Sequence, residues 1–332
     1  MPAEWAPHRA CWTALPHLEE EWLDALSGAR EELLQLVERI ATQGAERVEL
    51  LVPDAAAAEA IRQRLPSPRI RLHPMRYGDS WLRDTGPIFL NDGSALAFRF
   101  DGWGGKFQMP GDTEVAARIA ERAEAPLRSI DFVLEGGAIE VDGEGSCMTT
   151  RDCLLARHPE RSEAEIEAVL AEALGVDRVI WLDGALRNDH TDGHIDTLAR
   201  FVAPGHVVCM EPSPGEPNAE MLEGLAAALE RTEDAQGRRL KVSRLPSAGA
   251  ILDPEGALMP ASYCNFYIAN EAVIVPLYGC AHDETALRAL RPLFPGRRVV
   301  GSPSRALLRG GGAFHCVTQQ EPQGARLEEE NR

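Results

Sequence analysis

Five side chains in this 332-residue sequence could do chemistry together, because each one stands beside a glycine or in a turn. They are Cys316 in GGGAFHC, His194 and Asp196 in HTDGHIDT, Asp84 in WLRDTGP and Glu135 in LEGGAI. Glycine lets the backbone come close to a ligand, so a cysteine directly after a glycine run is placed like a reactive group. A catalytic cysteine also needs a histidine supplied from elsewhere in the chain.

The glycines at 310–312 favour a nucleophile over the more common role of a lone cysteine as a small apolar filler. Gly311 and Gly312 are therefore expected to line the site beside Cys316. His315 is adjacent in sequence, but on a strand it would point to the opposite face from Cys316. We therefore expect a structural role for His315.

The segment HTDGHIDTLARF supplies an imidazole and a carboxylate. If IDTLARFV is a strand, His194 and Asp196 lie two residues apart and share one face. His190 stands four residues before His194, so His190, His194 and Asp196 could instead bind zinc or iron. The TDG between the histidines favours a turn over a helix, which weakens this metal-site hypothesis.

Carboxylates beside a cysteine oppose thiolate formation, because like charges raise the pKa of a thiol. Taken singly, Asp84 could cap a turn through its own backbone, and Glu135 could be a solvated carboxylate at a strand end. Together they suit a cationic substrate, because a planar guanidinium pairs with carboxylates through two hydrogen bonds. Two aspartates could hold such a group while the thiol attacks its central carbon.

Composition limits the function classes. A net charge of -18 argues against nucleic acid as a partner and is compatible with a cationic ligand, although most carboxylates on helical faces serve solubility. No run of about eighteen apolar residues predicts a membrane span, and the N-terminal segment lacks the features of a signal peptide. Seven cysteines form no CxxC pair, so we expect reduced thiols and a cytoplasmic location.

Helical and extended patterns alternate along the chain, which predicts the α/β class. We expect one domain over 1–332, with a frayed tail at about 321–332. Apolar spacing predicts helices at 26–43, 55–65, 113–123, 163–174, 218–232 and 283–294. Buried strands are expected at 47–53, 69–75, 178–182, 206–210, 272–278 and 297–301.

Polar and glycine-rich clusters recur at a similar interval. Anchored on Asp84, Glu135, His194, Asn265 and Cys316, their gaps are 51, 59, 71 and 51 residues. One cluster per fifth of the chain suggests a radial arrangement in which each unit directs a loop at a shared centre.

The sequence resembles the agmatine deiminase and Porphyromonas-type peptidylarginine deiminase family of guanidine-modifying enzymes. The similarity covers nearly the whole chain and rests on motifs in the family's order. These are MPAEWAPHRACWTALPH, WLRDTGP, FDGWGGKF, LEGGAIEVDGEGSCMTT, GVDRVIWL, DHTDGHIDTLARFV, SYCNFYIANEAVIVPLYG and GGGAFHCVTQQEP. The resemblance implies a five-bladed, pseudosymmetric α/β propeller of the pentein type, built from ββαβ-like units around a central site.

The resemblance also assigns roles to the residues that match the family's motifs. Cys316 corresponds to the nucleophile, His194 to the acid/base, Asp84 and Asp196 to the guanidinium-binding pair, and Glu135 to the orienting glutamate. Trp81, Trp103 and Asn265 are expected to line or support the pocket. The alternatives are core packing for Trp103 and a buried backbone cap for Asn265. Ala138, Glu140, Cys264 and Ala313 depart from the residues usual in the family.

The implied reaction is hydrolysis of the C–N bond of a linear amidine: agmatine and water give N-carbamoylputrescine and ammonia through a covalent thiouronium on Cys316. The resemblance implies neither a metal nor an organic cofactor. Another guanidine or a peptidylarginine is the alternative substrate within the family. Alternatives of other classes are a metal-dependent amidohydrolase using His190, His194 and Asp196, and a non-catalytic guanidine-binding protein. A homodimer is one option for the assembly.

Overall fold

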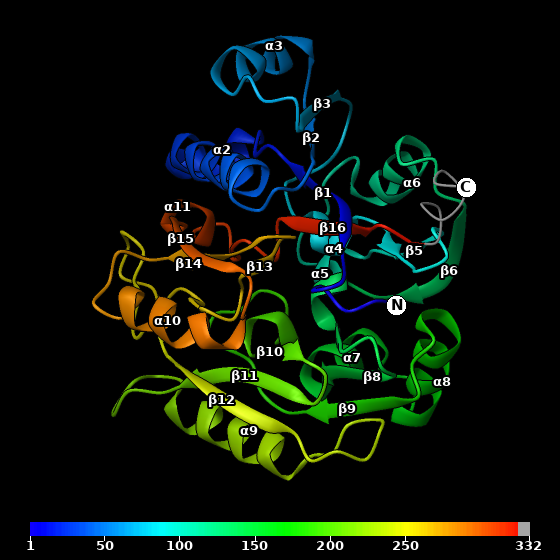
Figure 1. Ribbon diagram of the computed structural model, residues 1–332, viewed down its shortest axis with the longest axis vertical. Coiled ribbons are helices and arrows are strands. Elements are labelled where there is room, and N and C mark those ends of the chain that lie inside the picture. The colour runs from blue at the N-terminus through cyan, green and yellow to red at the C-terminus, as the bar shows by residue number, and fades with distance from the viewer. Residues whose placement is uncertain (325–332) are drawn as a thin grey trace.

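The fold is a mixed α/β arrangement of small sheets with helices around them (Figure 1). A computed structural model describes residues 1–324. Within these residues the strands form five separate sheets. No helix in the same residues is both long and apolar enough to cross a membrane. The mixture of helices and strands confirms the predicted α/β class.

Four of the sheets share one strand pattern. In each, the first strand is antiparallel to the second, and the second is parallel to the third. Their strands are β4 (Ile88–Phe89), β5 (Ala95–Arg99) and β6 (Leu127–Val133); β7 (Glu140–Val141), β8 (Ser146–Thr150) and β9 (Arg178–Leu182); β10 (Ala199–Ala203), β11 (His206–Glu211) and β12 (Lys241–Pro246); β13 (Tyr267–Ile268), β14 (Ala272–Leu277) and β15 (Arg298–Pro303).

The fifth sheet joins the two ends of the described chain. Its order is β16 (Thr318–Pro322), β1 (His8–Ala14), β2 (Val48–Val52) and β3 (Ile70–Pro74). β16 is antiparallel to β1, and β1 is parallel to β2, so this sheet repeats the pattern of the others. The expected frayed tail at about 321–332 starts too early, because Glu321 and Pro322 belong to β16; positions 325–332 lie outside the described residues.

Helices connect the second and third strands of each unit, because parallel strands need a crossover. The helices longer than one turn are α2 (Leu26–Thr42), α3 (Ala55–Arg64), α6 (Asp112–Arg122), α7 (Arg151–Arg157), α8 (Glu163–Leu174), α9 (Ala219–Arg231) and α10 (Asp283–Leu290). Local sequence fixes their ends: Ser162 and Glu165 form a capping box at the start of α8, and Gly175 ends it with a φ of 69°.

Three further sequence-based expectations are corrected. The helix expected over 283–294 ends at Leu290 and continues as a 3₁₀ turn, Arg291–Leu293, because Pro292 has no amide hydrogen for the helix ladder. The strand expected over IDTLARFV begins only at Ala199, and Ile195–Thr197 is a 3₁₀ turn. His315 and Cys316 also lie in a turn, before β16.

Short segments that carry the candidate residues directly precede the first strand of each sheet. α4 (Leu82–Thr85) contains Asp84 and precedes β4, and η2 (Gly136–Ala138) follows Glu135 and precedes β7. η3 (Ile195–Thr197) contains Asp196 and precedes β10, while the remaining two segments hold Asn265 and Cys316. The recurring clusters of the sequence thus occupy equivalent positions in the five sheets.

Candidate active site

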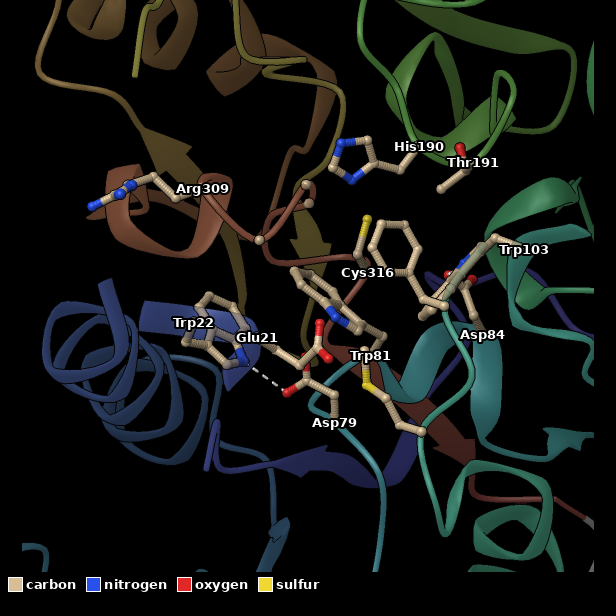
Figure 2. Close-up of a pocket in the computed structure, with 15 residues that line it drawn as sticks. Glu21, Trp22, Asp79, Trp81, Asp84, Trp103, His190, Thr191, Arg309 and Cys316 are labelled. Atoms are coloured by element: carbon tan, nitrogen blue, oxygen red, sulfur yellow. Dashed lines mark hydrogen bonds between the residues drawn. The ribbon is translucent and has the colours of Figure 1, made fainter. Parts of the chain in front are cut away.

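Cys316 lies in the turn before β16, and its side chain lines a cavity (Figure 2). Its Sγ accepts a hydrogen bond from Asn265 Nδ2 at 3.2 Å and lies 3.6 Å from Asp196 Oδ2. Asn265 Oδ1 also accepts the backbone amide of Cys316 at 3.3 Å. Asn265 therefore caps the backbone of the turn and contacts the thiol as well. Burial, followed by the charges of Asp196 and Asp84, raises the pKa of Cys316 well above its ordinary value.

The cavity has a volume of about 120 Å³, and several aromatic side chains line it. Trp22 and Trp81 stack with their ring centroids 5.5 Å apart, and Trp103 lines another part of the wall (Figure 2). The carboxylates of Glu21 and Asp79 also line it. Trp81 and Trp103, which were expected to line or support the pocket, thus both lie on the cavity wall.

The glycine run at 310–312 lets the backbone pass close to the aromatic rings and to the Cys316 thiol. A Cβ on Gly310 would lie 2.7 Å from both Trp22 and Trp81, closer than side chains allow. A Cβ on Gly312 would lie 2.8 Å from Trp81 and 3.0 Å from Cys316 Sγ. Gly311 has a φ of +103°, which favours glycine. Part of the space that these glycines clear is therefore filled by the protein's own side chains, which form the wall around Cys316.

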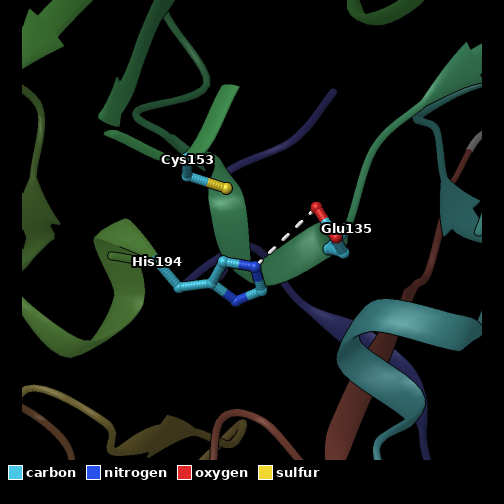
Figure 3. Close-up of side chains that lie close together, drawn as sticks. All are labelled: Glu135, Cys153 and His194. Carbon is cyan, nitrogen blue, oxygen red and sulfur yellow. Dashed lines mark ion pairs between the residues drawn. The ribbon is translucent and has the colours of Figure 1, made fainter. Parts of the chain in front are cut away.

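His194 lies between the carboxylates of Asp84 and Glu135, and Figure 3 shows its contact with Glu135. Its Nδ1 is 3.7 Å from Asp84 Oδ1, and its Nε2 is 3.8 Å from Glu135 Oε2. Neither nitrogen has a hydrogen-bond partner within residues 1–324, and the side chain is fully buried. Burial by itself disfavours the charged imidazolium, but Asp84, Cys153 and Glu135 outweigh it and hold the pKa of His194 well above its ordinary value.

Asp84 is fixed by donors from two other loops. Its Oδ2 accepts a hydrogen bond from Trp103 Nε1 at 2.9 Å, and its Oδ1 accepts one from the Gly137 amide at 3.0 Å. Burial raises the pKa of Asp84. Trp103 has φ 54° and ψ 52°, a left-handed conformation that is rare for a large side chain. A non-glycine residue held in this conformation often marks a functional site.

Gly137 is the point where the site is most crowded. A Cβ there would lie 2.5 Å from His194 Nδ1, 2.9 Å from Asp84 Oδ1 and 3.1 Å from Asp196 Oδ2. Only a residue without a side chain lets these three groups converge. The sequence motif LEGGAI contained this glycine, but its spacing alone did not reveal that contact.

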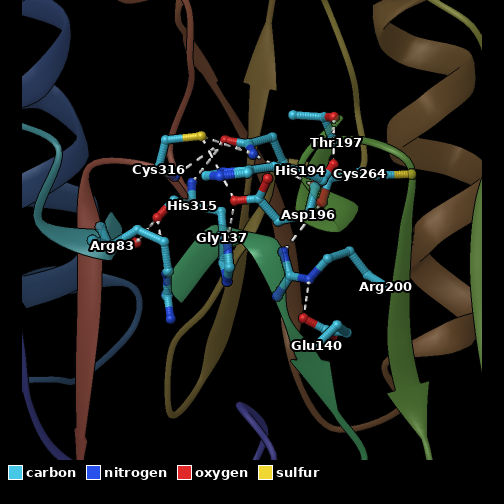
Figure 4. A network of polar contacts seen from close by, with 12 residues as sticks. Arg83, Gly137, Glu140, His194, Asp196, Thr197, Arg200, Cys264, His315 and Cys316 are labelled. Carbon is cyan, nitrogen blue, oxygen red and sulfur yellow. Dashed lines mark hydrogen bonds and ion pairs between the residues drawn. The ribbon is translucent and has the colours of Figure 1, made fainter. Parts of the chain in front are cut away.

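Asp196 uses one oxygen within the protein and leaves the other without a partner. Its Oδ2 accepts a hydrogen bond from His315 Nδ1 at 2.7 Å, whereas Oδ1 has no hydrogen-bond partner in the part of the chain that is described (Figure 4). Burial would raise its pKa, but the hydrogen bond and charge of His315 outweigh burial and lower the pKa of Asp196. His315 therefore acts as a hydrogen-bond partner of Asp196. It lies in a turn and not on the expected strand.

Glu135 is held by an arginine that sequence reasoning missed. Arg157 Nε donates to Glu135 Oε1 at 2.7 Å, and Arg157 Nη1 donates to Asp192 Oδ2 at the same distance. Burial opposes ionisation of Glu135, but His194 and Arg157 lower its pKa below the ordinary value. Glu135 Oε2 remains without a hydrogen-bond partner among residues 1–324 and faces His194.

The metal-ligand set considered from sequence is not the one that the fold brings together. Within residues 1–324, two groups of three potential metal ligands have their ligand atoms within 4.8 Å of one another. One is Glu135, Cys153 and His194, and the other is Glu4, Glu140 and His315. Arg157 already pairs with Glu135, and Arg200 pairs with both Glu4 and Glu140. His190 instead lines the same cavity as Cys316 and packs against Phe107.

The structure places Cys316, His194, Asp196, Asp84 and Glu135 close to one another, whereas His190 does not join His194 and Asp196. The five candidate groups, with Asn265 and Gly137, contact one another through the distances given above. Sequence reasoning missed Trp22, Asp79, Phe107, Arg157 and Glu4. Phe107 lies in the motif FDGWGGKF and Trp22 lies five residues after MPAEWAPHRACWTALPH, but nothing in local sequence shows that an aromatic ring faces a cavity.

Comparisons with known proteins agree over nearly the full length. The family model for Porphyromonas-type peptidyl-arginine deiminase matches residues 1–322. The chain is 39% identical to an agmatine deiminase of Stutzerimonas stutzeri, covering 97% of this chain and 95% of that protein. It is 37% identical to one of Pseudomonas syringae pv. tomato, with the same coverage.

Solved structures of related proteins have the same fold. An agmatine deiminase of Enterococcus faecalis superimposes with a TM-score of 0.90 at 32% identity, covering 97% of this chain and 95% of that one. An arginine deiminase candidate from Porphyromonas gingivalis gives 0.88 at 35% identity, covering 98% of both chains.

Proposed function

This chain belongs to the Porphyromonas-type peptidyl-arginine deiminase family, and on that premise we propose that it hydrolyses agmatine to N-carbamoylputrescine and ammonia. The proposal names a hydrolase that acts on the C–N bond of a small cationic guanidine. The similar proteins of S. stutzeri and P. syringae carry the name agmatine deiminase, which supports this substrate.

One observation carries the chemistry: a buried thiol faces acceptors that lack donors. Asp196 Oδ1 and Glu135 Oε2 are acceptors without a hydrogen-bond partner in the described residues, and neither nitrogen of His194 has a partner there. Unsatisfied buried polar atoms cost free energy, so a site that keeps several of them is suited to a ligand that supplies donors. A guanidinium is planar, carries a positive charge and offers only donors. Such a group would satisfy these acceptors in the first step of binding.

In the proposed mechanism, Asp84 and Asp196 hold the guanidinium so that its central carbon faces Cys316 Sγ. The cation offsets the neighbouring carboxylates that raise the thiol's pKa, and so favours the thiolate in the complex. The sulfur attacks the central carbon, and His194, held by Glu135, protonates the departing nitrogen. The C–S bond forms, the C–N bond breaks, and the thiol proton is carried away on ammonia, which leaves a thiouronium.

Hydrolysis of the thiouronium completes the cycle. His194 accepts a proton from water, whose oxygen attacks the same carbon and becomes the ureido oxygen. The C–S bond breaks, one proton returns to Cys316, and the other converts ammonia to ammonium. No electron acceptor is needed in either half of the reaction, and atoms balance with one water consumed.

The test is ammonia release by purified protein from agmatine, arginine and an arginyl peptide in parallel, with and without chelator. Chelator-insensitive release from agmatine alone supports the proposal. Release only from arginine or the peptide would show that one of these, and not agmatine, is the substrate. Chelator-sensitive release would support the amidohydrolase alternative. Cys316→Ala should abolish turnover but still bind agmatine in calorimetry; turnover retained in that variant contradicts the mechanism.

We also propose that the five sheets are blades of a pseudosymmetric propeller and that 1–332 form one deiminase domain. Support comes from the strand pattern that the five sheets share and from the segment with a site residue before each first strand. The cytoplasmic location, a homodimer and the lack of nucleic-acid binding stay predictions. Cell fractionation, light scattering and a binding assay with DNA and RNA test them.

A further inference from the structure

A line of alternating charges runs from the active site into the protein interior. It consists of Asp196, His315, Glu4, Arg200 and Glu140, which we call the buried relay. Figure 4 labels all of these residues except Glu4. All five side chains are buried. The proposed reaction uses only Asp196, so the other four need a separate explanation.

Each ring nitrogen of His315 faces a carboxylate. Its Nδ1 lies 2.7 Å from Asp196 Oδ2, and its Nε2 lies 2.9 Å from Glu4 Oε2. An ionised carboxylate can accept hydrogen bonds but cannot donate them, and a neutral imidazole carries only one N–H. Both contacts can be hydrogen bonds to carboxylates only when His315 donates from both nitrogens as an imidazolium.

Glu4 in turn is fixed from its far side. Its Oε2 also accepts a hydrogen bond from Arg200 Nη2, and its Oε1 accepts the Ile268 amide at 2.7 Å. Burial opposes ionisation, but Arg200 and His315 hold the pKa of Glu4 well below its ordinary value. The N-terminal segment thus delivers an anion directly behind an active-site histidine.

Arg200 anchors the relay to the backbone. Its Nε donates to Glu140 Oε2 at 2.9 Å, and its Nη1 donates to the carbonyl oxygens of Phe266 and Cys264 at 2.8 and 3.2 Å. The guanidinium also lies over the Phe266 ring, 4.7 Å from its centroid. Because every end is bonded, the imidazole of His315 has little freedom to move.

We propose that Glu4 and His315 are positioning residues, which fix the Asp196 carboxylate and leave its free oxygen Oδ1 for the guanidinium. This inference rests on the proposed function, because it takes Asp196 as a binding group for a cation. His315 engages Oδ2, so rotation of the carboxylate would break a charge-assisted hydrogen bond. The relay therefore acts on substrate binding more than on the chemical step.

The test compares Glu4→Gln with the wild-type protein and a matched control, Glu46→Gln. Glu46 is equally buried and contacts a different histidine, His8, at 3.2 Å, as well as the Tyr267 hydroxyl at 2.6 Å. Removing the Glu4 charge should raise the KM for agmatine about tenfold while kcat changes less than about threefold, as for other outer partners of binding groups. Glu46→Gln should leave KM unchanged.

A purely structural role predicts another pattern. If Glu4→Gln lowers the melting temperature and the amount of active enzyme but leaves KM as in the wild type, the relay does not position Asp196. Should that variant fail to fold, Glu4→Asp keeps the charge but shortens the side chain, and a smaller rise in KM is expected; an unchanged KM overturns the proposal. Failure of the proposed function is separate, because then the wild-type protein itself releases no ammonia from agmatine.

Discussion

Two buried histidines approach the site from different sides, and they are held in opposite ways. His194 has carboxylates at 3.7 and 3.8 Å and no hydrogen-bond partner for either nitrogen within residues 1–324. His315 has carboxylates at 2.7 and 2.9 Å, both within hydrogen-bond distance. A group that gives and takes protons must keep its nitrogens available, whereas a group that fixes a neighbour is saturated. The contrast fits the proposed roles, with His194 as the acid/base and His315 as a positioning residue.

The largest expected effect tests the contrast directly by replacing each histidine with glutamine. His194→Gln removes the proposed acid/base and should lower kcat roughly 10³-fold. His315→Gln should keep kcat within about tenfold and act mainly through KM, because one of the two donors to the carboxylates is lost. Steady-state ammonia release measures both. Equal losses of kcat in the two variants would break the comparison.

A second variant changes Gly137, which lies against His194 and the carboxylate that His315 binds. Gly137→Ala places a methyl group 2.5 Å from His194 Nδ1 and 3.1 Å from Asp196 Oδ2, so the site must open. We expect kcat/KM to fall at least about 100-fold, since small displacements of reacting groups are costly. The matched control is Gly224→Ala in α9, where a Cβ meets nothing within 4 Å and alanine favours the helix. That control should keep full activity and equal or greater stability.

A third experiment sharpens the role of charge around His194. The anion of Glu135 favours the imidazolium, so Glu135→Gln should lower the pKa of His194. The imidazolium then loses its proton at lower pH, and the alkaline limb of kcat/KM should move to lower pH, with about a tenfold loss at the optimum. Glu163→Gln, which removes a partly exposed partner of Arg151, should leave the profile in place. An unmoved alkaline limb in Glu135→Gln would show that Glu135 does not tune His194.

The smallest effect concerns a carboxyl that lacks the cations of the relay. Burial raises the pKa of Asp112 to about 7 from an ordinary 3.8. Its folded pKa lies above its unfolded pKa, so folding favours the protonated form and stability is lost as pH rises between these values. Asp112→Asn should therefore raise the free energy of unfolding by about 2 kcal/mol at pH 8 and by little near pH 4. Urea unfolding at both pH values measures this, and an equal effect at both would contradict the assignment.

Local sequence was sufficient for most of the elements. Buried runs such as AVIVPL form β14, and the apolar spacing of residues 26–43 forms α2, because these segments satisfy their own backbone pairing and burial rules. It failed where a single turn changes the direction of the chain. Ile195–Thr197 has β-branched residues typical of a strand, yet it turns, and this turn places Asp196 against His315.

The sequence by itself determined which chemical groups are present and that one polar cluster recurs per unit. Cys316, His194, Asp84, Asp196 and Glu135 stand in motifs whose order resembles the family's, and the family match agrees. What only the tertiary structure decided are contacts between residues far apart in sequence. Arg157 reaches Glu135, Glu4 reaches His315 across more than 300 positions, and Gly137 clears the space between three charged groups. The physical reason is that the pKa and orientation of a buried group depend on which charges surround it in space, and local patterns do not encode those neighbours.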